Sequence, residues 1–290
     1  MALKKENSKF IDLGSRGRLN KKNKLNDLTG KEWLKFTKSW FIHRPPRRKE
    51  DELLHPAKFP ETLVEDFVSF FTKMNDVVFD PFMGTGSTLI AASELGRKSI
   101  GIELNNNYFR SASQRISKRG LKKLVFPIKG NSLRIKELFK ENGFNQTKID
   151  YTITSPPYWN QLERNSIRQK ERKQKGFDTK YSERNDDLGN IKSYEDFLDQ
   201  QALVFDQVYD ITKPNGYLTI VTNNVYFEGR LYPLAFDTAT SLTKRGEKSW
   251  VLKDEKIWLQ DDKKLIALGV NNAWVGNRHH QYCLIFRKEK

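Results

Sequence analysis

From residue 60 onward, short apolar runs alternate with longer segments in which apolar residues recur every three or four positions. The short runs predict buried strands at 77–79, 99–102, 124–128, 151–153 and 217–221. The longer segments predict helices at 60–73, 87–95, 106–118, from 132 onward, and at 194–211. Strand-like stretches at 250–259 and 281–286 add an antiparallel hairpin at one edge. The pattern predicts an α/β fold with a mostly parallel, seven-stranded sheet and helices on both faces.

The first 50 residues differ from the rest because they are polar and basic, with only a few aromatic residues. Trp33, Phe36 and Trp40 have helical spacing, which predicts a short amphipathic helix over 30–41. The basic, proline-containing segment 44–49 is typical of a linker. We therefore expect a basic N-terminal extension over 1–50 and a main domain over 51–290, which carries a basic insertion at about 160–190.

Charge adds a candidate partner to this picture. The 290-residue chain has a formal net charge of +16 and a mean hydropathy of -0.73. Residues 1–50 carry 15 Lys and Arg against 5 Asp and Glu, and residues 162–184 carry 8 against 4. Two segments thus hold most of the excess charge, which favours nucleic acid as a partner and predicts that both segments contact phosphate.

Other features narrow the class of protein. Cys283 is the only cysteine, so an intrachain disulfide and a cysteine-based zinc site are both excluded. No metal site is predicted. The first residues lack the apolar core of a secretory signal, and about 18 consecutive apolar residues, the length of a membrane span, occur nowhere. We expect a cytoplasmic protein, in a prokaryote or in the host of a phage.

A glycine-containing turn follows the first strand of the main domain, in the sequence Asp80-Pro-Phe-Met-Gly-Thr-Gly86. In an open α/β sheet, ligands bind at the carboxyl ends of the strands. Gly84 and Gly86 would let the backbone approach a ligand, and Ser87 can cap the helix that follows. The turn lacks the Lys of a phosphate-binding loop and the third Gly of a dinucleotide fingerprint. By itself it is equally typical of a plain structural turn.

Two polar residues end the next strands. Glu103 lies 17 residues beyond Gly86, where a carboxylate can accept hydrogen bonds from both hydroxyls of a ribose. Asn131 follows the third strand, and two roles stay open for it: a contact with an adenine edge, or a simple helix cap.

A second motif, Ser155-Pro156-Pro157-Tyr158, ends the fourth strand. The exocyclic amine of a base is a poor nucleophile because its lone pair is delocalised into the ring. The Ser155 hydroxyl and the Pro156 carbonyl can accept hydrogen bonds from that amine, while prolines add no competing donor. Tyr158 offers a face on which a flipped base can stack. These residues predict methyl transfer by proximity and orientation.

The two motifs, together with His55-Pro-Ala-Lys-Phe-Pro60 and Asn277-Arg-His-His-Gln-Tyr282, resemble those of the amino-methyltransferases that modify DNA at cytosine N4 or adenine N6. The resemblance implies a Rossmann-like sheet with a terminal hairpin, S-adenosylmethionine as methyl donor and double-stranded DNA as substrate. It also implies the cofactor-binding residues His55, Lys58, Asp80, Phe82, Gly84, Thr85, Gly86, Ser87, Glu103 and Asn131.

The chain departs from the family pattern in places. Asn131 stands where an Asp is common, many relatives have the two main motifs in the opposite order, and no large recognition domain is present. Within the family, a leading Ser such as Ser155 favours cytosine N4, while adenine N6 and an RNA base remain alternatives. A cytosine-C5 mechanism needs a thiolate, and Cys283 lies in a late apolar strand. A cognate restriction endonuclease is a candidate partner, and the oligomeric state, monomer or dimer, stays open.

Overall fold

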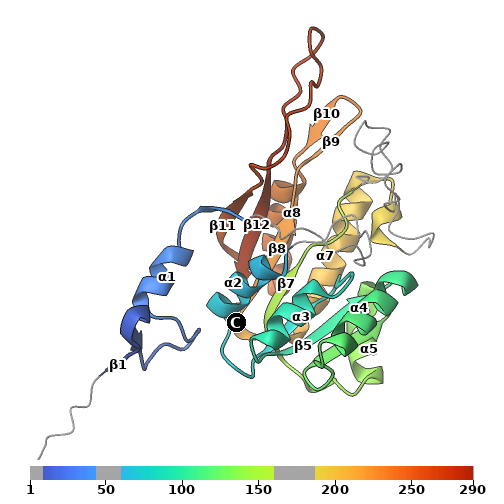
Figure 1. Cartoon of the computed structure of the whole chain (residues 1–290). Coiled ribbons are helices and arrows are strands. Elements are labelled where there is room, and N and C mark those ends of the chain that lie inside the picture. Colours follow the sequence, from blue (N-terminus) through green and yellow to red (C-terminus); the bar gives the residue numbers. More distant parts are fainter. Residues whose placement is uncertain (1–8, 44–59, 160–186, 290) are drawn as a thin grey trace, which may run out of the picture.

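An eight-stranded sheet forms the centre of the protein in the computed structural model, which describes residues 9–43, 60–159 and 187–289 (Figure 1). Five neighbouring strands are parallel, and β12 runs antiparallel to both β8 and β11. In order across the sheet the strands are β3 (Trp40–Ile42), β11 (Val251–Leu259), β12 (His280–Arg287), β8 (Thr212–Thr222), β7 (Ile149–Thr154), β4 (Val77–Asp80), β5 (Lys98–Glu103) and β6 (Val125–Lys129).

The predicted α/β fold, with its mostly parallel sheet and C-terminal antiparallel hairpin, is confirmed. The sheet has one strand more than expected because β3 pairs in parallel with β11. The expected helix over 30–41 is wrong in its second half: α1 (Gly30–Phe36) ends early and Trp40 begins β3. Two contacts explain this, since the Lys256 ammonium binds the carbonyls of Phe36 and Lys38, and the Ile257 amide donates to the Ser39 carbonyl at 2.8 Å.

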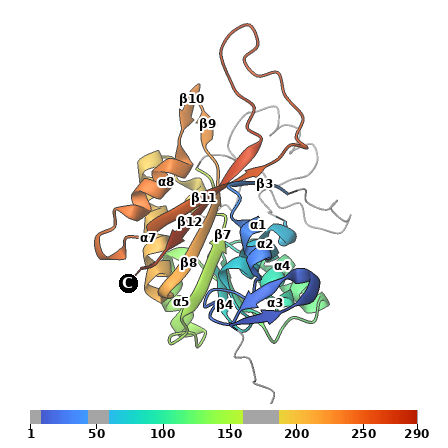
Figure 2. The ribbon, with the colours of Figure 1, turned by 90° about the vertical axis from the view of Figure 1, so that its left-hand side faces the viewer.

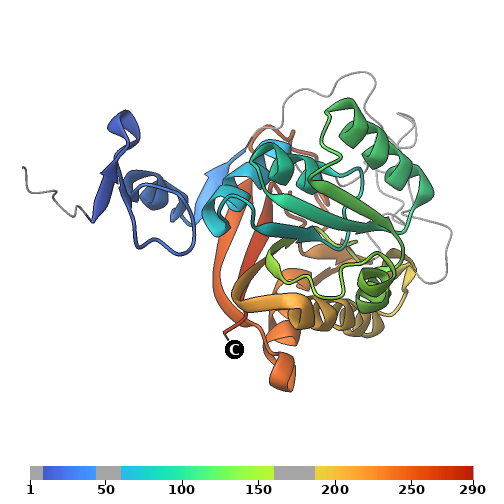
Figure 3. The same cartoon turned by 90° about the horizontal axis from the view of Figure 1, so that it is seen from below.

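Helices cover both faces of the sheet (Figures 2 and 3). One face carries α2 (Glu61–Phe71), α3 (Ser87–Glu94) and α4 (Asn106–Lys118). The other carries α5 (Ile135–Glu141), α7 (Tyr194–Ile211) and α8 (Leu234–Thr243). Short 3-10 turns are η1 (Gly14–Arg16), η2 (Ser132–Arg134), η3 (Leu188–Asn190) and η4 (Gly246–Lys248). The central parallel strands β4, β5 and β7 are mostly apolar because both of their faces are buried.

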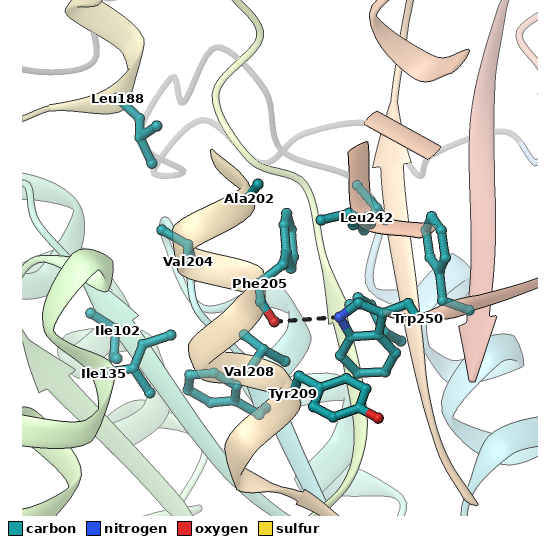
Figure 4. Close-up of a cluster of buried hydrophobic side chains, with 14 of the residues drawn as sticks. Ile102, Ile135, Leu188, Ala202, Val204, Phe205, Val208, Tyr209, Leu242 and Trp250 are labelled. Carbon is teal, nitrogen blue, oxygen red and sulfur yellow. Dashed lines mark hydrogen bonds between the residues drawn. The ribbon is translucent and has the colours of Figure 1, made fainter. Parts of the chain in front are cut away.

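The core on the α7 face is built around aromatic side chains (Figure 4). Ser193 caps α7 by accepting from the Asp196 amide at 3.1 Å, and the helix then buries Phe205 and Val208 against the sheet. Trp250 is 1% exposed, and its indole donates to the Phe205 carbonyl at 3.4 Å. The polar atom of this large side chain is therefore satisfied where it is buried.

The N-terminal segment adds a small unit beside α2. A hairpin of β1 (Phe10–Asp12) and β2 (Arg18–Asn20) precedes α1, which begins at a capping box between Thr29 and Glu32. Phe36 stacks on Phe70 of α2 with ring centroids 4.1 Å apart, and the Asn26 amide donates to the Phe70 carbonyl at 2.6 Å. The predicted boundary near residue 50 stays a prediction, because 44–59 lie outside the described residues.

Two projections leave the sheet at the carboxyl end of β8 (Figure 1). One is the hairpin of β9 (Val225–Phe227) and β10 (Arg230–Tyr232), and the other is the 260–279 loop between β11 and β12. The Arg278 guanidinium lies 5.9 Å from the ring centroid of Tyr226. This contact joins the 260–279 loop to the β9–β10 hairpin close to the sheet.

Cys283 lies in the middle of β12 and is fully buried, and this burial raises the pKa of its thiol to about 12. Of the helices in the described part of the chain, none is long and apolar enough to cross a membrane. Residues 9–43, 60–159 and 187–289 also contain no group of three or more His, Cys, Asp or Glu side chains placed to hold a metal ion.

Candidate active site

A pocket lies beyond the carboxyl ends of β4, β5, β6 and β7. It encloses about 600 Å³ of space, part of which is open solvent. The pocket is lined by both apolar and polar groups, as the binding of a nucleoside would require. The apolar surface comes from Pro81, Phe82, Ile102, Leu104, Tyr108, Pro157 and Leu188, and the polar groups from Gly84, Glu103, Asn105, Asn131, Ser132, Ser155 and Asp187.

The glycine turn takes the backbone shape that the sequence predicts. Gly84 and Gly86 have φ of 53° and 81°, a region that other residues rarely adopt. A Cβ atom on Gly86 would lie 3.1 Å from the Cβ of Ala112 in α4. Two features therefore favour glycine at position 86: its positive φ, and the close approach of α3 to α4.

Asp80 ends β4 directly before this turn and is 1% exposed. Its Oδ1 accepts from the Thr154 hydroxyl at 2.6 Å and from the Phe82 amide at 2.9 Å, and its Oδ2 accepts from the Thr88 hydroxyl at 2.6 Å. Burial raises its pKa to about 6, although these hydrogen bonds act in the opposite direction. Asp80 is not among the residues that line the pocket; its hydrogen bonds hold the turn, α3 and β7 together, and the cofactor contact expected for it stays a prediction.

Glu103 ends β5 and faces the pocket. Its two oxygens accept from the Gly84 amide at 2.9 Å and from the Asn105 amide at 2.6 Å. Burial raises its pKa to about 7 in spite of these two donors. Each carboxylate oxygen has a second lone pair, so Glu103 keeps capacity to accept from a ribose diol while it fixes the glycine turn.

Asn131 lines the pocket and also caps η2, since its side chain accepts from the Leu133 amide at 2.9 Å. The cap role is thus present in the structure, and the contact with adenine stays a prediction. The neighbouring Ser132 hydroxyl donates to the Pro81 carbonyl, which ties the strand end of β6 to the glycine turn.

The other expected cofactor residues fall into three groups. Phe82 lines the pocket. Thr85 and Ser87 do not: the carbonyl of Thr85 accepts from the Arg115 guanidinium, and Ser87 is buried with no hydrogen-bond partner for its hydroxyl within the described part of the chain. His55 and Lys58 lie outside the described residues.

The catalytic turn comes next to this pocket because β7 is the neighbour of β4. Ser155 and Pro157 line the pocket. The Tyr158 hydroxyl donates to Oε1 of Gln281 at 3.0 Å and lies 3.2 Å from the Ser155 hydroxyl oxygen. Because the tyrosine proton is engaged by Gln281, the Ser155 proton can point to the tyrosine oxygen. That arrangement leaves the lone pairs of Ser155 available to a donor in the pocket.

Tyr158 is 6% exposed and belongs to the hydrophobic core, so the stacking of a flipped base on its ring stays a prediction. Its hydroxyl instead connects the turn to β12, and the Trp159 indole beside it donates to the Lys192 carbonyl at 3.0 Å.

Sequence reasoning missed several residues of the pocket, and also Gln281, which lies outside the pocket and accepts from Tyr158. Asn105 and Tyr108 are near the start of α4, and Asp187 and Leu188 come from the far side of the insertion. Gln281 was missed because the adjacent His279 and His280 offered more obvious candidate chemistry. Asn105 alone carried a usable signal, because an Asn two residues after a strand-ending Glu is a typical helix cap.

Comparisons with known proteins place the chain in a family. The sequence profile of a DNA methylase family, N6_N4_Mtase, matches residues 4–114 and 149–290. The protein belongs to this DNA methylase family. Its methyl donor is S-adenosylmethionine, and the mixed apolar and polar pocket beside Glu103 fits that nucleoside-containing cofactor.

Parts of this chain are also similar to type II methyltransferases. M2.LlaDCHI from Lactococcus lactis subsp. cremoris is 42% identical over 64 residues, which are 22% of this chain and 24% of the relative. M.BglII from Bacillus subtilis is 30% identical over 115 residues, or 40% of this chain and 31% of the relative. The matches span less than a third of these relatives.

Solved methyltransferases also resemble the chain. TrmN from Thermus thermophilus has a TM-score of 0.49 with 11% identity, over 79% of this chain and 48% of that one. An rRNA methylase from Streptococcus thermophilus has a TM-score of 0.45 with 13% identity, over 80% of this chain and 98% of that one.

Proposed function

We propose that this protein transfers the methyl group of S-adenosylmethionine to the exocyclic amine of a flipped base in double-stranded DNA. The observation that carries the proposal is that Glu103 and Ser155 line one pocket. A ribose acceptor and an amine acceptor are thereby brought to the same cleft, as the transfer of a methyl group between two bound molecules requires.

The residues divide the work between binding and orientation. Glu103 accepts from the ribose, and the apolar walls at Phe82, Ile102 and Tyr108 surround the adenosine. Ser155 accepts a hydrogen bond from the base amine, and the prolines after it hold its position. The donor supplies the electrophilic methyl group, and the protein removes the cost of aligning it with the amine.

We place the methyl group on cytosine N4, with adenine N6 as the alternative. Support for this choice comes from the leading Ser155 of the turn. A role in a restriction-modification system, in the cytoplasm and beside a cognate endonuclease, belongs to the same proposal because several matched relatives bear type II methyltransferase names.

Nucleoside mass spectrometry on DNA from a methylation-free host that expresses the chain tests this proposal. N4-methylcytosine in that DNA, absent with Ser155→Ala, is the expected result. N6-methyladenine would keep the mechanism and overturn the choice of base. If neither modified base appears while the purified protein binds S-adenosylmethionine, DNA is the wrong substrate and RNA becomes the one to test.

A further inference from the structure

The 260–279 loop carries large apolar side chains that nothing in the described structure covers. Trp274 is 93% exposed, Leu265 80% and Val270 64%. Isolated exposed apolar residues are normal, but a tryptophan and two aliphatic side chains that are exposed within ten residues of one loop indicate a binding surface.

This loop has a definite shape. At its base the Gln260 amide donates to the His279 carbonyl at 2.7 Å. Further out, the side-chain amide of Asn277 donates to the Ile266 carbonyl at 2.8 Å and accepts from the Ile266 amide at 2.9 Å. These bonds join its two limbs. At the tip, the Ala273 amide donates to the Gly269 carbonyl at 2.8 Å, so Trp274 follows a closed turn.

The position of the loop ties it to the catalytic turn. It returns to the sheet at β12, where Gln281 accepts from Tyr158 beside Ser155. It projects from the same end of the sheet as the β9–β10 hairpin, whose base it meets through Arg278 and Tyr226 (Figure 1). A substrate that presents a base to Ser155 therefore lies beside these two projections.

The chemistry of the loop fits a nucleic acid duplex. Asn271 and Asn272 lie at its tip, and amide side chains can read base edges. The loop contains Lys263, Lys264 and Arg278 against Asp261 and Asp262, and the basic side chains on its two limbs can meet phosphates. Apolar side chains act as wedges between base steps, and aromatic rings stack on bases. A limb of about nine residues can extend up to roughly 30 Å, which exceeds the ~8.5 Å depth of a major groove.

We propose that the 260–279 loop enters the DNA duplex and that Trp274 stacks on the bases next to the flipped nucleotide, which holds the helix open while the target base occupies the pocket. This inference rests on the proposed DNA methyltransferase function. It assigns the opening of the duplex to this loop, in addition to the phosphate contacts expected from the basic segments of the sequence.

The test compares wild type, Trp274→Ala and Trp274→Phe on two DNA duplexes that contain the target site. One duplex is fully paired, and in the other the target base faces a mismatch, so that it is already unstacked. For Trp274→Ala we expect kcat/KM to fall about 5- to 150-fold on paired DNA, the range that the loss of one stacking contact gives. The loss should shrink to less than about threefold on the mismatch, and Trp274→Phe should lie between the two.

Two controls keep the outcome clear. Met74→Ala removes another apolar side chain, 65% exposed and at the opposite end of β4, and should leave both rates unchanged. The affinity of Trp274→Ala for S-adenosylmethionine should equal that of wild type. Wild-type tryptophan fluorescence should also be quenched by DNA more strongly than that of Trp274→Phe.

Three results would overturn the inference. These are equal activity of Trp274→Ala and wild type, an equal loss on both duplexes, or a change of oligomeric state on size exclusion with unaltered activity on DNA, which would make the loop a protein contact. If the wild-type protein methylates no DNA, the proposed function is wrong, and the inference about the loop is rejected with it. If wild type methylates DNA and Trp274→Ala does so equally well, only this inference fails.

Discussion

Thr154 donates a 2.6 Å hydrogen bond from its hydroxyl to Oδ1 of Asp80 and so joins the last residue of β7 to the last residue of β4. Ser155 directly follows Thr154, and the glycine turn directly follows Asp80. The two motifs that face each other in the pocket are therefore held by one buried contact between the strands that carry them. This contact and the pairing of β4 with β7 together fix the spacing between Ser155 and the glycine turn.

Replacement of Thr154 by Val should lower the free energy of unfolding by about 1–3 kcal/mol, because a buried carboxylate loses a donor while the shape of the side chain is kept. Urea unfolding monitored by circular dichroism measures the change. Thr154→Ser retains the hydroxyl and should cost less. Equal destabilisation by both substitutions would mean that the methyl group, and not the hydrogen bond, is what matters.

Glu103 should make cofactor binding depend on pH. Hydroxyls of a ribose donate to the ionised carboxylate, and the pKa of Glu103 is raised to about 7 by burial. Below that pH the side chain must first lose a proton, so the Kd for S-adenosylmethionine should rise roughly tenfold from pH 8 to pH 6. Isothermal titration calorimetry at several pH values tests this, and Glu103→Gln should bind more weakly with a flat pH profile. A pH-independent Kd in wild type would argue against the ribose contact.

Gly86→Ala should cost more stability than Gly120→Ala. Both glycines have positive φ, 81° and 71°, so both substitutions carry a backbone penalty of about 1–2 kcal/mol. Only at position 86 does a new Cβ also meet Ala112, at 3.1 Å, whereas nothing lies within 4 Å at position 120. Thermal unfolding of the two variants separates the backbone penalty from the contact. Equal melting temperatures would show that α4 moves away without cost.

Gln281→Leu should lower kcat and leave the affinity for S-adenosylmethionine unchanged. Without the Gln281 acceptor, the Tyr158 hydroxyl can donate to the Ser155 oxygen at 3.2 Å or to the Val221 carbonyl at 3.5 Å, and when it donates to Ser155 the proton of Ser155 turns toward the pocket. A donor would face the base amine in place of an acceptor. Gln281→Glu keeps an acceptor and should retain more activity. Single-turnover kinetics on saturating DNA measures the effect, and an unchanged kcat in Gln281→Leu would contradict the role assigned to Tyr158.

The parallel part of the fold could be predicted from sequence because its strands are buried on both faces and therefore continuously apolar. Strand β4 and strand β5 lie within one or two residues of the positions that the apolar runs indicated. Strand β3 could not be predicted in this way. Trp33, Phe36 and Trp40 have helical spacing, and only the distant Lys256 and β11 divide that segment into a helix and a strand.

The site shows a similar division. Glu103 and Ser155 were found because their chemistry and their place after a strand agree, and both line the pocket. For Asp80 the sequence indicated a place beside the glycine turn, but it could not reveal that the residue is 1% exposed and accepts from Thr88 and Thr154. Gln281 was missed because its partner Tyr158 is 123 positions away, and no local pattern records such a contact.

The single cysteine has a practical consequence. Cys283 is the only thiol in the chain, it is fully buried in β12, and burial disfavours its reactive thiolate form. Maleimide reagents should therefore leave the folded wild-type protein unmodified. A cysteine introduced at an exposed position of the 260–279 loop would then accept one fluorophore per chain, so distances from that loop to labelled DNA could be followed during the reaction without a cysteine-free background.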